Sequence, residues 1–292
     1  MTVLRDALRE WGERLRAAES CEPEVEARLI ACHLLDLDLG QLPARLDAAL
    51  SDDARARADR ILAARAARVP LPYVLGEAYF YGLRLRCDRR ALVPRPETEL
   101  LVDVALEWLR GRGPATIVDI GTGSGCVALA LAAQQPAARI VATDASSRAL
   151  ELARANAEAL GYADRIRFLR GDLLAPVRQA GLVSAVRGLV ANLPYVSEAE
   201  YLTGQPELQH EPRRALVAGP TGLEAVARLI EQLPTLANLE FVGLEISATQ
   251  GSAPVRMLEF SLPWWRAELR QDLAGLDRVA VAFRVHRESD QR

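Results

Sequence analysis

A glycine-rich segment carries the clearest chemical signal in the sequence. Residues 117–125 read Ile-Val-Asp-Ile-Gly-Thr-Gly-Ser-Gly, an apolar strand that runs through a loop into a helix. Glycines let a backbone approach a ligand closely, and the free N–H groups of a helix N-terminus attract an anion. A dinucleotide-binding loop needs G-x-G-x-x-G, but Cys126 stands at the third glycine position. The loop therefore favours S-adenosylmethionine, which presents a carboxylate and an amino group instead of phosphates. The cofactor-binding residues predicted here are Asp119, Gly121, Thr122, Gly123 and Gly125.

Two acidic residues after later strands extend this predicted site. Asp144 ends the next apolar strand, 19 residues beyond Gly125, where an acid can bind both ribose hydroxyls. Asp172 stands in Gly-Asp-Leu after the third strand and is placed to reach the adenine edge. Each feature alone is also typical of a tight turn or a helix cap. Their occurrence after successive strands favours adenosyl binding.

The tetrapeptide Asn192-Leu193-Pro194-Tyr195 follows a fourth strand, and ligands of open α/β sheets lie beyond the carboxyl ends of strands. It resembles the Asn/Asp-Pro-Pro-Tyr motif of amino-methyltransferases, which methylate a nitrogen attached to a planar group. The Asn192 oxygen can accept one N–H of such a nitrogen, and the carbonyl of Leu193 or Pro194 another. Pro194 stiffens the loop, and Tyr195 can stack on the planar group and favour the developing cation. We predict that Asn192, Pro194 and Tyr195 are catalytic and that Asn192 also contacts the cofactor. An ordinary strand exit with an asparagine cap is the alternative.

Composition excludes several other chemistries. The 292 residues include 36 basic residues, all of them arginine, against 39 acids, for a net charge of −3. A Schiff-base lysine and a phosphate-loop lysine are therefore excluded, and a globally basic nucleic-acid binder is disfavoured. Three scattered histidines and four cysteines without a CxxC pair predict no metal site. Few cysteines, with neither a signal peptide nor a long apolar span, predict a cytoplasmic protein with no membrane contact.

The apolar pattern indicates which elements position these loops. Residues 1–68 show helical spacing, as in Leu4, Leu8, Trp11 and Leu15, and predict a small helical bundle. From residue 115, strands and helices alternate, which is typical of a doubly wound parallel sheet covered by helices on both faces. Strands are expected at 116–120, 139–143, 166–169, 188–191, 241–246 and in the tail, and helices at 124–133, 147–160 and 222–233. The predicted domains are an N-terminal helical substrate-recognition domain at 1–75, a β-hairpin linker at 76–95 and a cofactor-binding domain at 96–292.

The segment at 92–102 identifies a family. It reads Leu-Val-Pro-Arg-Pro-Glu-Thr-Glu-Leu-Leu-Val and resembles the signature of the HemK-like release-factor glutamine methyltransferases. The resemblance covers about residues 70–285 and includes the stretches 72–77, 80–82, 119–125, 155–157, 171–173, 192–195, 211–212, 244–246 and 272–275. It implies a mostly parallel, seven-stranded, Rossmann-like methyltransferase sheet with an N-terminal helical domain.

The resemblance also implies an activity and assigns residues to it. Such enzymes transfer a methyl group from S-adenosylmethionine to the side-chain amide nitrogen of the glutamine in the Gly-Gly-Gln motif of class I peptide release factors. Asn192 and Tyr195, with Leu193 and Pro194, would hold that amide, while Gly121 and Asp144 would hold the cofactor. Pro94, Arg95, Pro96 and Glu97 would shape the entrance between the domains, and Thr98 could approach the cofactor. The implied partner is a release factor, with no stable nucleic acid, and the protein is expected to be a monomer.

Departures from the family pattern leave two alternatives open. Leu193 replaces a proline, residues 236–240 lack the usual paired glycines, and Ser247 replaces a glycine. We expect these later changes, and the unusual Trp264-Trp265 in the tail, at the far edge of the sheet. The tetrapeptide would serve an adenine-N6 methyltransferase of RNA or DNA equally well, and the departures could mark a decayed chain that only binds cofactor.

Charge distribution bears on the partner. Residues 55–95 hold ten arginines against three acids, a local charge of +7. Such a surface would steer a protein with an acidic flank, with RNA or plain solvation as the rival interpretations.

Overall fold

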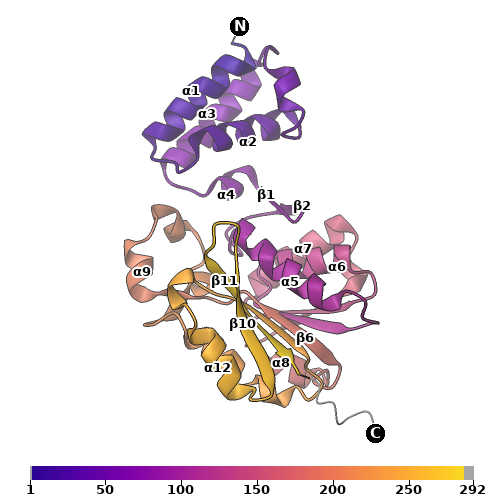
Figure 1. The fold of residues 1–292 in the computed structure, drawn as a ribbon. Helices are drawn as coiled ribbons and strands as arrows, with labels where there is room; N and C mark the ends of the chain where they lie inside the picture. The colour runs from indigo at the N-terminus through magenta and orange to yellow at the C-terminus, as the bar shows by residue number, and fades with distance from the viewer. Residues whose placement is uncertain (1, 286–292) are drawn as a thin grey trace. The chain divides into compact units, whose positions relative to one another are not determined.

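The first of two compact units is a bundle of helices, as the apolar spacing predicted (Figure 1). The computed structural model describes residues 2–285, and the units comprise residues 1–78 and 79–292. Leu4 and Trp11 are buried in the core of the bundle. Ser51 caps the third helix, and the buried Arg65 binds Glu26 of the second helix through two hydrogen bonds of 2.9 Å. The helices are α1 (Leu4–Ala17), α2 (Pro23–Leu35), the 3₁₀ helix η1 (Leu42–Arg45), α3 (Asp52–Ala66) and α4 (Leu71–Leu75).

A short hairpin lies where the sequence predicted one. Strands β1 (Glu77–Phe80) and β2 (Leu83–Arg86) pair, and the boundary between the units falls within β1. The turn residues Tyr81 and Gly82 both have positive φ, 50° and 75°, a backbone that matches the twist of paired strands.

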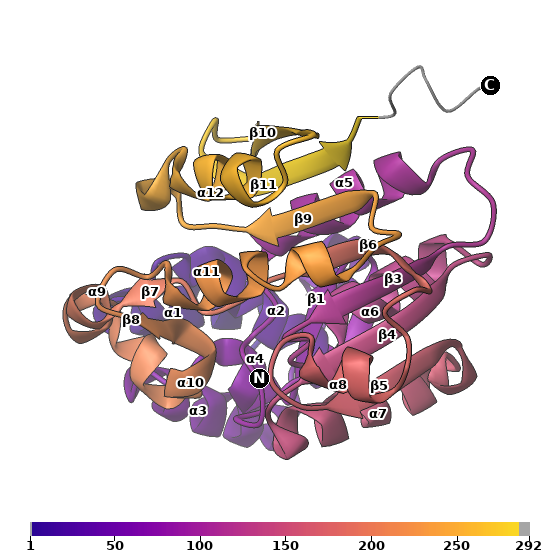
Figure 2. The same cartoon turned by 90° about the horizontal axis from the view of Figure 1, so that it is seen from below.

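The second unit is built on a seven-stranded sheet in the order β10-β11-β9-β6-β3-β4-β5 (Figure 2). All neighbouring pairs among β9, β6, β3, β4 and β5 are parallel, and β11 is antiparallel to both of its neighbours. The prediction of a doubly wound, mostly parallel Rossmann-like sheet is therefore confirmed. The strands are β3 (Thr116–Ile120), β4 (Arg139–Asp144), β5 (Ile166–Arg170), β6 (Val186–Ala191), β9 (Phe241–Glu245), β10 (Trp265–Gln271) and β11 (Asp277–Arg284).

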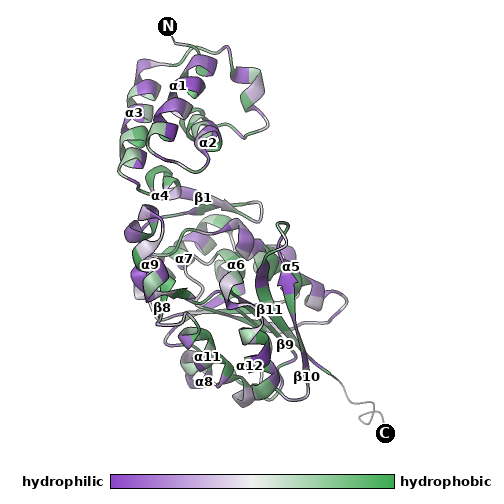
Figure 3. Ribbon diagram, turned by 60° about the vertical axis from the view of Figure 1, so that its left-hand side comes forward, coloured by the Kyte–Doolittle hydropathy of each residue, from purple (hydrophilic) through white to green (hydrophobic). Residues whose placement is uncertain are grey.

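Helices cover both faces of this sheet, each over its own apolar cluster. Ile117 and Phe241 of the sheet face one cluster, with Leu101 of α5 and Leu129 of α6, while Leu189 faces the other. Figure 3 shows apolar residues concentrated along the central strands, while the helices carry both apolar and polar residues. The first face carries α5 (Glu99–Leu109), α6 (Cys126–Gln134) and α7 (Ser147–Leu160), and the second carries α8 (Ala175–Gln179), α11 (Glu224–Ile230) and α12 (Ala253–Ser261).

A long excursion between β6 and α11 was not predicted from the sequence. It begins directly after the tetrapeptide and returns as a strand that pairs with its own start. Its elements are β7 (Val196–Ser197), α9 (Glu198–Thr203), η4 (Pro206–His210), α10 (Arg213–Leu216) and β8 (Val217–Gly219). The remaining 3₁₀ turns are η2 (Pro96–Thr98), η3 (Ala163–Arg165), η5 (Leu233–Thr235) and η6 (Ala248–Gln250).

The expectation that the departures at 236–247 lie at the far edge of the sheet is wrong. They flank β9, which lies between β6 and β11, while β10 forms the edge. Ser247 caps η6 in a capping box with Gln250, and the Gln250 side chain donates to the carbonyl of Gly222 at 2.8 Å. Gly222 has a φ of +79°, and a Cβ there would lie 2.3 Å from the carbonyl oxygen of Tyr195. Ser247 is therefore linked to the tetrapeptide through Gln250 and Gly222.

The two tryptophans of the tail behave differently. Trp265 opens β10 and packs against the second apolar cluster, whereas the Trp264 side chain is largely exposed. Within residues 2–285, none of the helices combines the length and the apolar character needed to cross a bilayer.

Candidate active site

A cavity of about 590 Å³ lies at the carboxyl ends of β3, β4 and β6. The connections run in opposite directions from β3 and β6, so the cavity occupies the switch point where open α/β sheets bind ligands. Most of the predicted site residues line it, but Gly125, Pro96, Glu97 and Tyr195 do not. Those that do are Arg95, Asp119, Gly121, Thr122, Gly123, Asp144, Asp172, Asn192, Leu193 and Pro194.

Backbone hydrogen bonds to β4 hold the glycine loop in place. The N–H groups of Gly121 and Thr122 both donate to the carbonyl of Thr143, at 2.8 and 2.9 Å. Gly121 has a φ of +75°, and a Cβ there would lie 3.1 Å from Leu193 Cδ2 and 3.4 Å from the carbonyl oxygen of Asn192. The loop after β3 therefore touches the tetrapeptide after β6, and glycine at position 121 makes this close approach possible.

Asp119 lies beneath this loop. Its side chain is buried and accepts a hydrogen bond of 2.7 Å from the Thr122 hydroxyl. Burial raises the pKa of Asp119 to about 7, although the hydrogen bonds from Thr122 and from the backbone N–H of Ala128 favour the ionised form. A carboxyl group so placed fixes the loop and contributes a polar atom to the cavity wall.

Asp144 is placed to bind a diol. Its two oxygens accept hydrogen bonds from the backbone N–H groups of Gly123, at 3.0 Å, and Ser146, at 2.7 Å. Burial raises its pKa, and these two N–H groups together with Arg214 oppose that shift. The carboxylate keeps lone pairs beyond those two bonds, and it lines the cavity, so it can accept two vicinal hydroxyls.

Gly125 and Asp172, the other two residues predicted to bind the cofactor, contact protein side chains. Gly125 has a φ of +85°, and a Cβ there would lie 3.1 Å from the Cβ of Ala153, so it serves the packing of α6 on α7. Asp172 lines the cavity but forms an ion pair with Arg228, and both side chains are more than half exposed.

The tetrapeptide is held by side chains of other elements. The Asn192 amide nitrogen donates to the Thr98 hydroxyl at 3.1 Å, which leaves the Asn192 oxygen able to accept from a ligand in the cavity. The Tyr195 hydroxyl donates to a carboxyl oxygen of Glu245, at the end of β9, at 3.3 Å. Burial raises the pKa of Tyr195, so the phenol stays neutral. Tyr195 therefore anchors the loop from beneath the cavity wall.

The residues before Thr98 are anchored to the excursion. Arg95 forms an ion pair with Glu211, whose side chain is fully buried and also accepts from the backbone N–H of Val93 at 3.0 Å. Pro96 and Glu97 are exposed on η2. The Arg95–Glu211 pair thus joins one rim of the cavity to the segment before α10.

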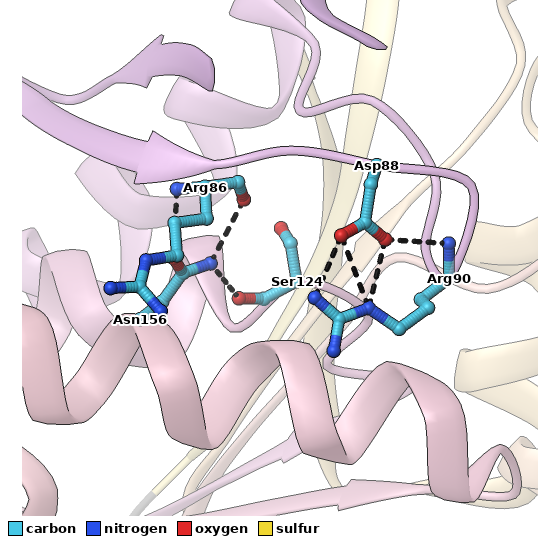
Figure 4. Close-up of polar contacts among 5 residues, drawn as sticks. All are labelled: Arg86, Asp88, Arg90, Ser124 and Asn156. Carbon is cyan, nitrogen blue, oxygen red and sulfur yellow. Dashed lines mark hydrogen bonds and ion pairs between the residues drawn. The ribbon is translucent and has the colours of Figure 1, made fainter. Parts of the chain in front are cut away.

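Asn156 links the segment before another cavity-lining loop to the glycine loop (Figure 4). Its side chain, on α7, exchanges hydrogen bonds with the backbone of Arg86, at 2.8 and 3.2 Å, and donates to the carbonyl of Ser124 at 3.0 Å. Asp88 accepts from the side chain and backbone of Arg90 and so shapes the loop that lines the cavity.

Sequence reasoning assigned no role to Asn156, Glu211 or Glu245, although all three stand in stretches that carry the family resemblance. Every one of these partners lies at least 32 residues away in the chain, so no local spacing reveals the contacts. Among residues 2–285, no cluster of three or more His, Cys, Asp or Glu side chains is arranged to hold a metal ion.

Comparison with known proteins identifies the family. The sequence model of the PrmC N-terminal domain matches residues 6–76, and that of the methyltransferase small domain matches residues 98–205. A release factor glutamine methyltransferase of Deinococcus radiodurans is 42% identical over 97% of this chain and 99% of its own length. Proteins of the same name from Nitratidesulfovibrio vulgaris and Cereibacter sphaeroides are 40% and 39% identical over 97% and 95% of this chain, and over 95% and 97% of their own lengths.

Solved structures agree on the fold. The hMettl16 catalytic domain, in complex with a MAT2A 3′UTR hairpin, aligns with a TM-score of 0.56 over 82% of this chain and 84% of its own, at 19% identity. The human methyltransferase 10 domain containing protein aligns with a TM-score of 0.52 over 70% of this chain and 91% of its own, at 16% identity. At these identities the likeness concerns the methyltransferase fold alone. The near full-length matches at about 40% identity show more: the chain is an S-adenosylmethionine-dependent methyltransferase and belongs to the release factor glutamine methyltransferase family.

Proposed function

We propose that this protein methylates the side-chain amide nitrogen of the glutamine in the Gly-Gly-Gln motif of class I peptide release factors. The observation that carries the proposal is the way Asn192 is held. Its amide nitrogen is engaged by Thr98 at 3.1 Å, so its oxygen is left to accept an N–H in the cavity. The names of its near full-length relatives supply the class of substrate.

A carboxamide nitrogen is a weak nucleophile because its lone pair is delocalised into the carbonyl group. The Asn192 oxygen and the carbonyl of Leu193 or Pro194 would accept its two N–H bonds and orient the nitrogen. The bound cofactor supplies a methyl group attached to a positively charged sulfur. Transfer forms one N–C bond, breaks the bond from that carbon to sulfur, and releases one proton from the nitrogen to water. No strong base is needed beforehand, since the proton can leave after the methyl group arrives.

The residues of the glycine loop and the strand ends fit the cofactor. Gly121, where a Cβ would crowd Leu193 and the carbonyl of Asn192, lines the same cavity as the Asp144 carboxylate, which can accept the ribose hydroxyls. In this proposal Asp119, Thr122 and Gly123 form the rest of that wall, Asp172 approaches the adenine edge, and Pro194 stiffens the acceptor loop. Pro94, Arg95, Pro96 and Glu97 shape the entrance, with Tyr195 as support for the loop.

The proposal is tested by incubating the protein with methyl-labelled cofactor and a class I release factor. Label should appear on the wild-type factor and be absent from a factor whose Gly-Gly-Gln glutamine is replaced by alanine. Equal labelling of both factors would overturn the proposal. Label on bulk RNA or DNA, with none on release factors, would favour the adenine-N6 alternative. Tight cofactor binding with no turnover on any substrate would favour a decayed chain.

Location and assembly stay predictions. Cysteine usage predicts a cytoplasmic protein, and we propose a monomer that binds release factors without stable contact to nucleic acid or membrane. Size-exclusion chromatography with light scattering tests the oligomeric state.

A further inference from the structure

Glu245 is a buried carboxyl group directly behind the tetrapeptide. It ends β9 with 5% of its surface exposed. One of its oxygens accepts from the Tyr195 hydroxyl at 3.3 Å, and the neighbouring Thr98 hydroxyl favours its ionised form. Within the described residues its Oε2 atom has no hydrogen-bond partner. A buried carboxyl with so few donors is costly, which points to a role beyond packing.

The contacts of Glu245 link both ends of the tetrapeptide. Asn192 reaches it through Thr98, whose side chain is 1% exposed, and Tyr195 reaches it directly. The register of the sheet explains this placement. Ala191, the last residue of β6, pairs with Leu244 of β9, and the residues that follow these two are Asn192 and Glu245.

The direction of these hydrogen bonds determines which end of the Asn192 side-chain amide faces the cavity. An ionised carboxylate only accepts, so a Thr98 hydroxyl bound to it must donate. The Thr98 oxygen is then left to accept, and its partner on Asn192 must be the amide nitrogen, as the structure has it. The Asn192 oxygen is consequently turned to the cavity, where an amide substrate needs an acceptor.

We propose that Glu245 is a positioning residue that, through Thr98 and Tyr195, keeps the oxygen of Asn192 and not its nitrogen toward the substrate amide. The inference rests on the proposed function, since it explains how the acceptor of that reaction is oriented. Glu245 touches no reacting atom and acts only through its two neighbours.

Protonation of Glu245 removes this bias. A protonated carboxyl can donate to Thr98, whose hydroxyl can then donate to the Asn192 oxygen, and the amide can turn over. Burial raises the pKa of Glu245 to about 7. Thr98, Tyr195 and Arg278 of β11 oppose this rise because they stabilise the carboxylate. Glu97 of η2 adds to it, since a second negative charge disfavours ionisation. Cys126 of α6 also lies within electrostatic range, and burial raises its own pKa to about 12. Arg278 is itself hydrogen-bonded to Asp272 at 2.8 Å. Turnover should therefore rise with pH as Glu245 ionises.

The kinetic test compares four variants with the wild type on a release factor. Glu245→Gln and Thr98→Val remove the acceptor-only carboxylate and the hydroxyl without changing side-chain size, and each should lower kcat by about 10- to 100-fold. The rise of kcat with pH, the acid limb of the pH profile, should vanish in both variants. The double variant should be no slower than the slower single variant. Thr98→Ser, which keeps the hydroxyl, should restore most of the activity that Thr98→Val loses, together with the acid limb. Glu240→Gln, which breaks ion pairs with Arg112 and Arg187 before β9, should retain kcat and the acid limb.

A second measurement needs no turnover. The side-chain amide NH₂ signals of Asn192, assigned by their absence in Asn192→Ala, should shift with pH in one step in ¹⁵N-labelled wild type. The step should persist in Thr98→Ser and Glu240→Gln and vanish in Glu245→Gln and Thr98→Val. A step that persists in Glu245→Gln, or wild-type kcat in that variant with an unchanged acid limb, would overturn the inference. A wild type that leaves release factors unlabelled but shows the step would refute the proposed function and leave the positioning role standing.

Discussion

The two walls of the cavity are held in place by different means. On the cofactor side, the loop after β3 is fixed by backbone hydrogen bonds from Gly121 and Thr122 to Thr143, and Asp144 is fixed by two backbone N–H groups. On the acceptor side, Asn192 is fixed by the side chain of Thr98, which stands 94 residues away in the chain. One wall is a local backbone structure, and the other is an assembly of side chains from distant elements.

This difference predicts how each wall responds to substitution. A backbone-held loop tolerates most side-chain changes and fails only where a glycine or a carboxylate is replaced. A wall of linked side chains fails at each link, and its failures depend on one another. The two walls can therefore be distinguished by measuring whether a variant loses methyl transfer, cofactor binding or stability.

The largest effect is expected at the acceptor wall. Asn192→Ala should lower kcat by about 100- to 1,000-fold, because the acceptor that orients the amide is removed while the glycine loop is untouched. Cofactor affinity, measured by calorimetry, should change far less than kcat. Asn238→Ala is the matched control, since its amide donates to the carbonyl of Ser184 at 2.7 Å, away from the cavity. Equal loss of kcat and cofactor affinity would place Asn192 in the cofactor pocket and would mean that the two walls do not act separately.

The converse split is expected at Asp144. Asp144→Asn should weaken cofactor binding by about 10- to 100-fold, the usual size of a hydrogen bond to a charged group. At saturating cofactor, kcat should recover. Asp164→Asn, at an exposed acid of η3, controls for the loss of charge. Unchanged cofactor affinity in Asp144→Asn would contradict the ribose-binding role.

Gly125 tests whether the whole glycine motif acts on the cofactor. Gly125→Ala should cost about 1–3 kcal/mol of stability, because a Cβ would lie 3.1 Å from Ala153 Cβ at a φ of +85°. Gly161→Ala is the matched control, since its φ is +76° but no atom lies within 4 Å of the added Cβ, so it should cost less. Cofactor affinity of the folded Gly125→Ala protein should stay unchanged. A weakened affinity with normal stability would return Gly125 to the binding surface.

The contrast between local and long-range contacts also explains which features could be predicted from the sequence. The helix at 147–160 was predicted with its observed bounds because its cap, apolar spacing and closing Gly161 are all local. The glycine loop and Asp144 were found for that reason. Glu245 was not, because its nearness to Asn192 depends on the register between β6 and β9, which no spacing encodes.

The missed elements have related causes. β10 is an edge strand whose alternating charged and apolar residues are only partly buried, so it lacks the continuous apolar run of the central strands. The excursion after Tyr195 consists of elements of two to six residues, whose stability comes from contacts such as Arg95–Glu211 rather than from their own periodicity.

The smallest effect is expected where the cofactor wall depends on side chains. Asp172 pairs with Arg228, and their side chains are 57% and 58% exposed, so breaking the pair should change stability by less than about 1 kcal/mol. The two partners should nevertheless differ in cofactor binding. Asp172→Asn should weaken it a few fold if the carboxylate accepts from the adenine edge, whereas Arg228→Gln should leave it unchanged or strengthen it by freeing that carboxylate. Calorimetric titration of both variants at fixed ionic strength measures the difference. Equal weakening in both would mean that the ion pair itself shapes the adenine pocket, and that this part of the cofactor wall is organised like the acceptor wall.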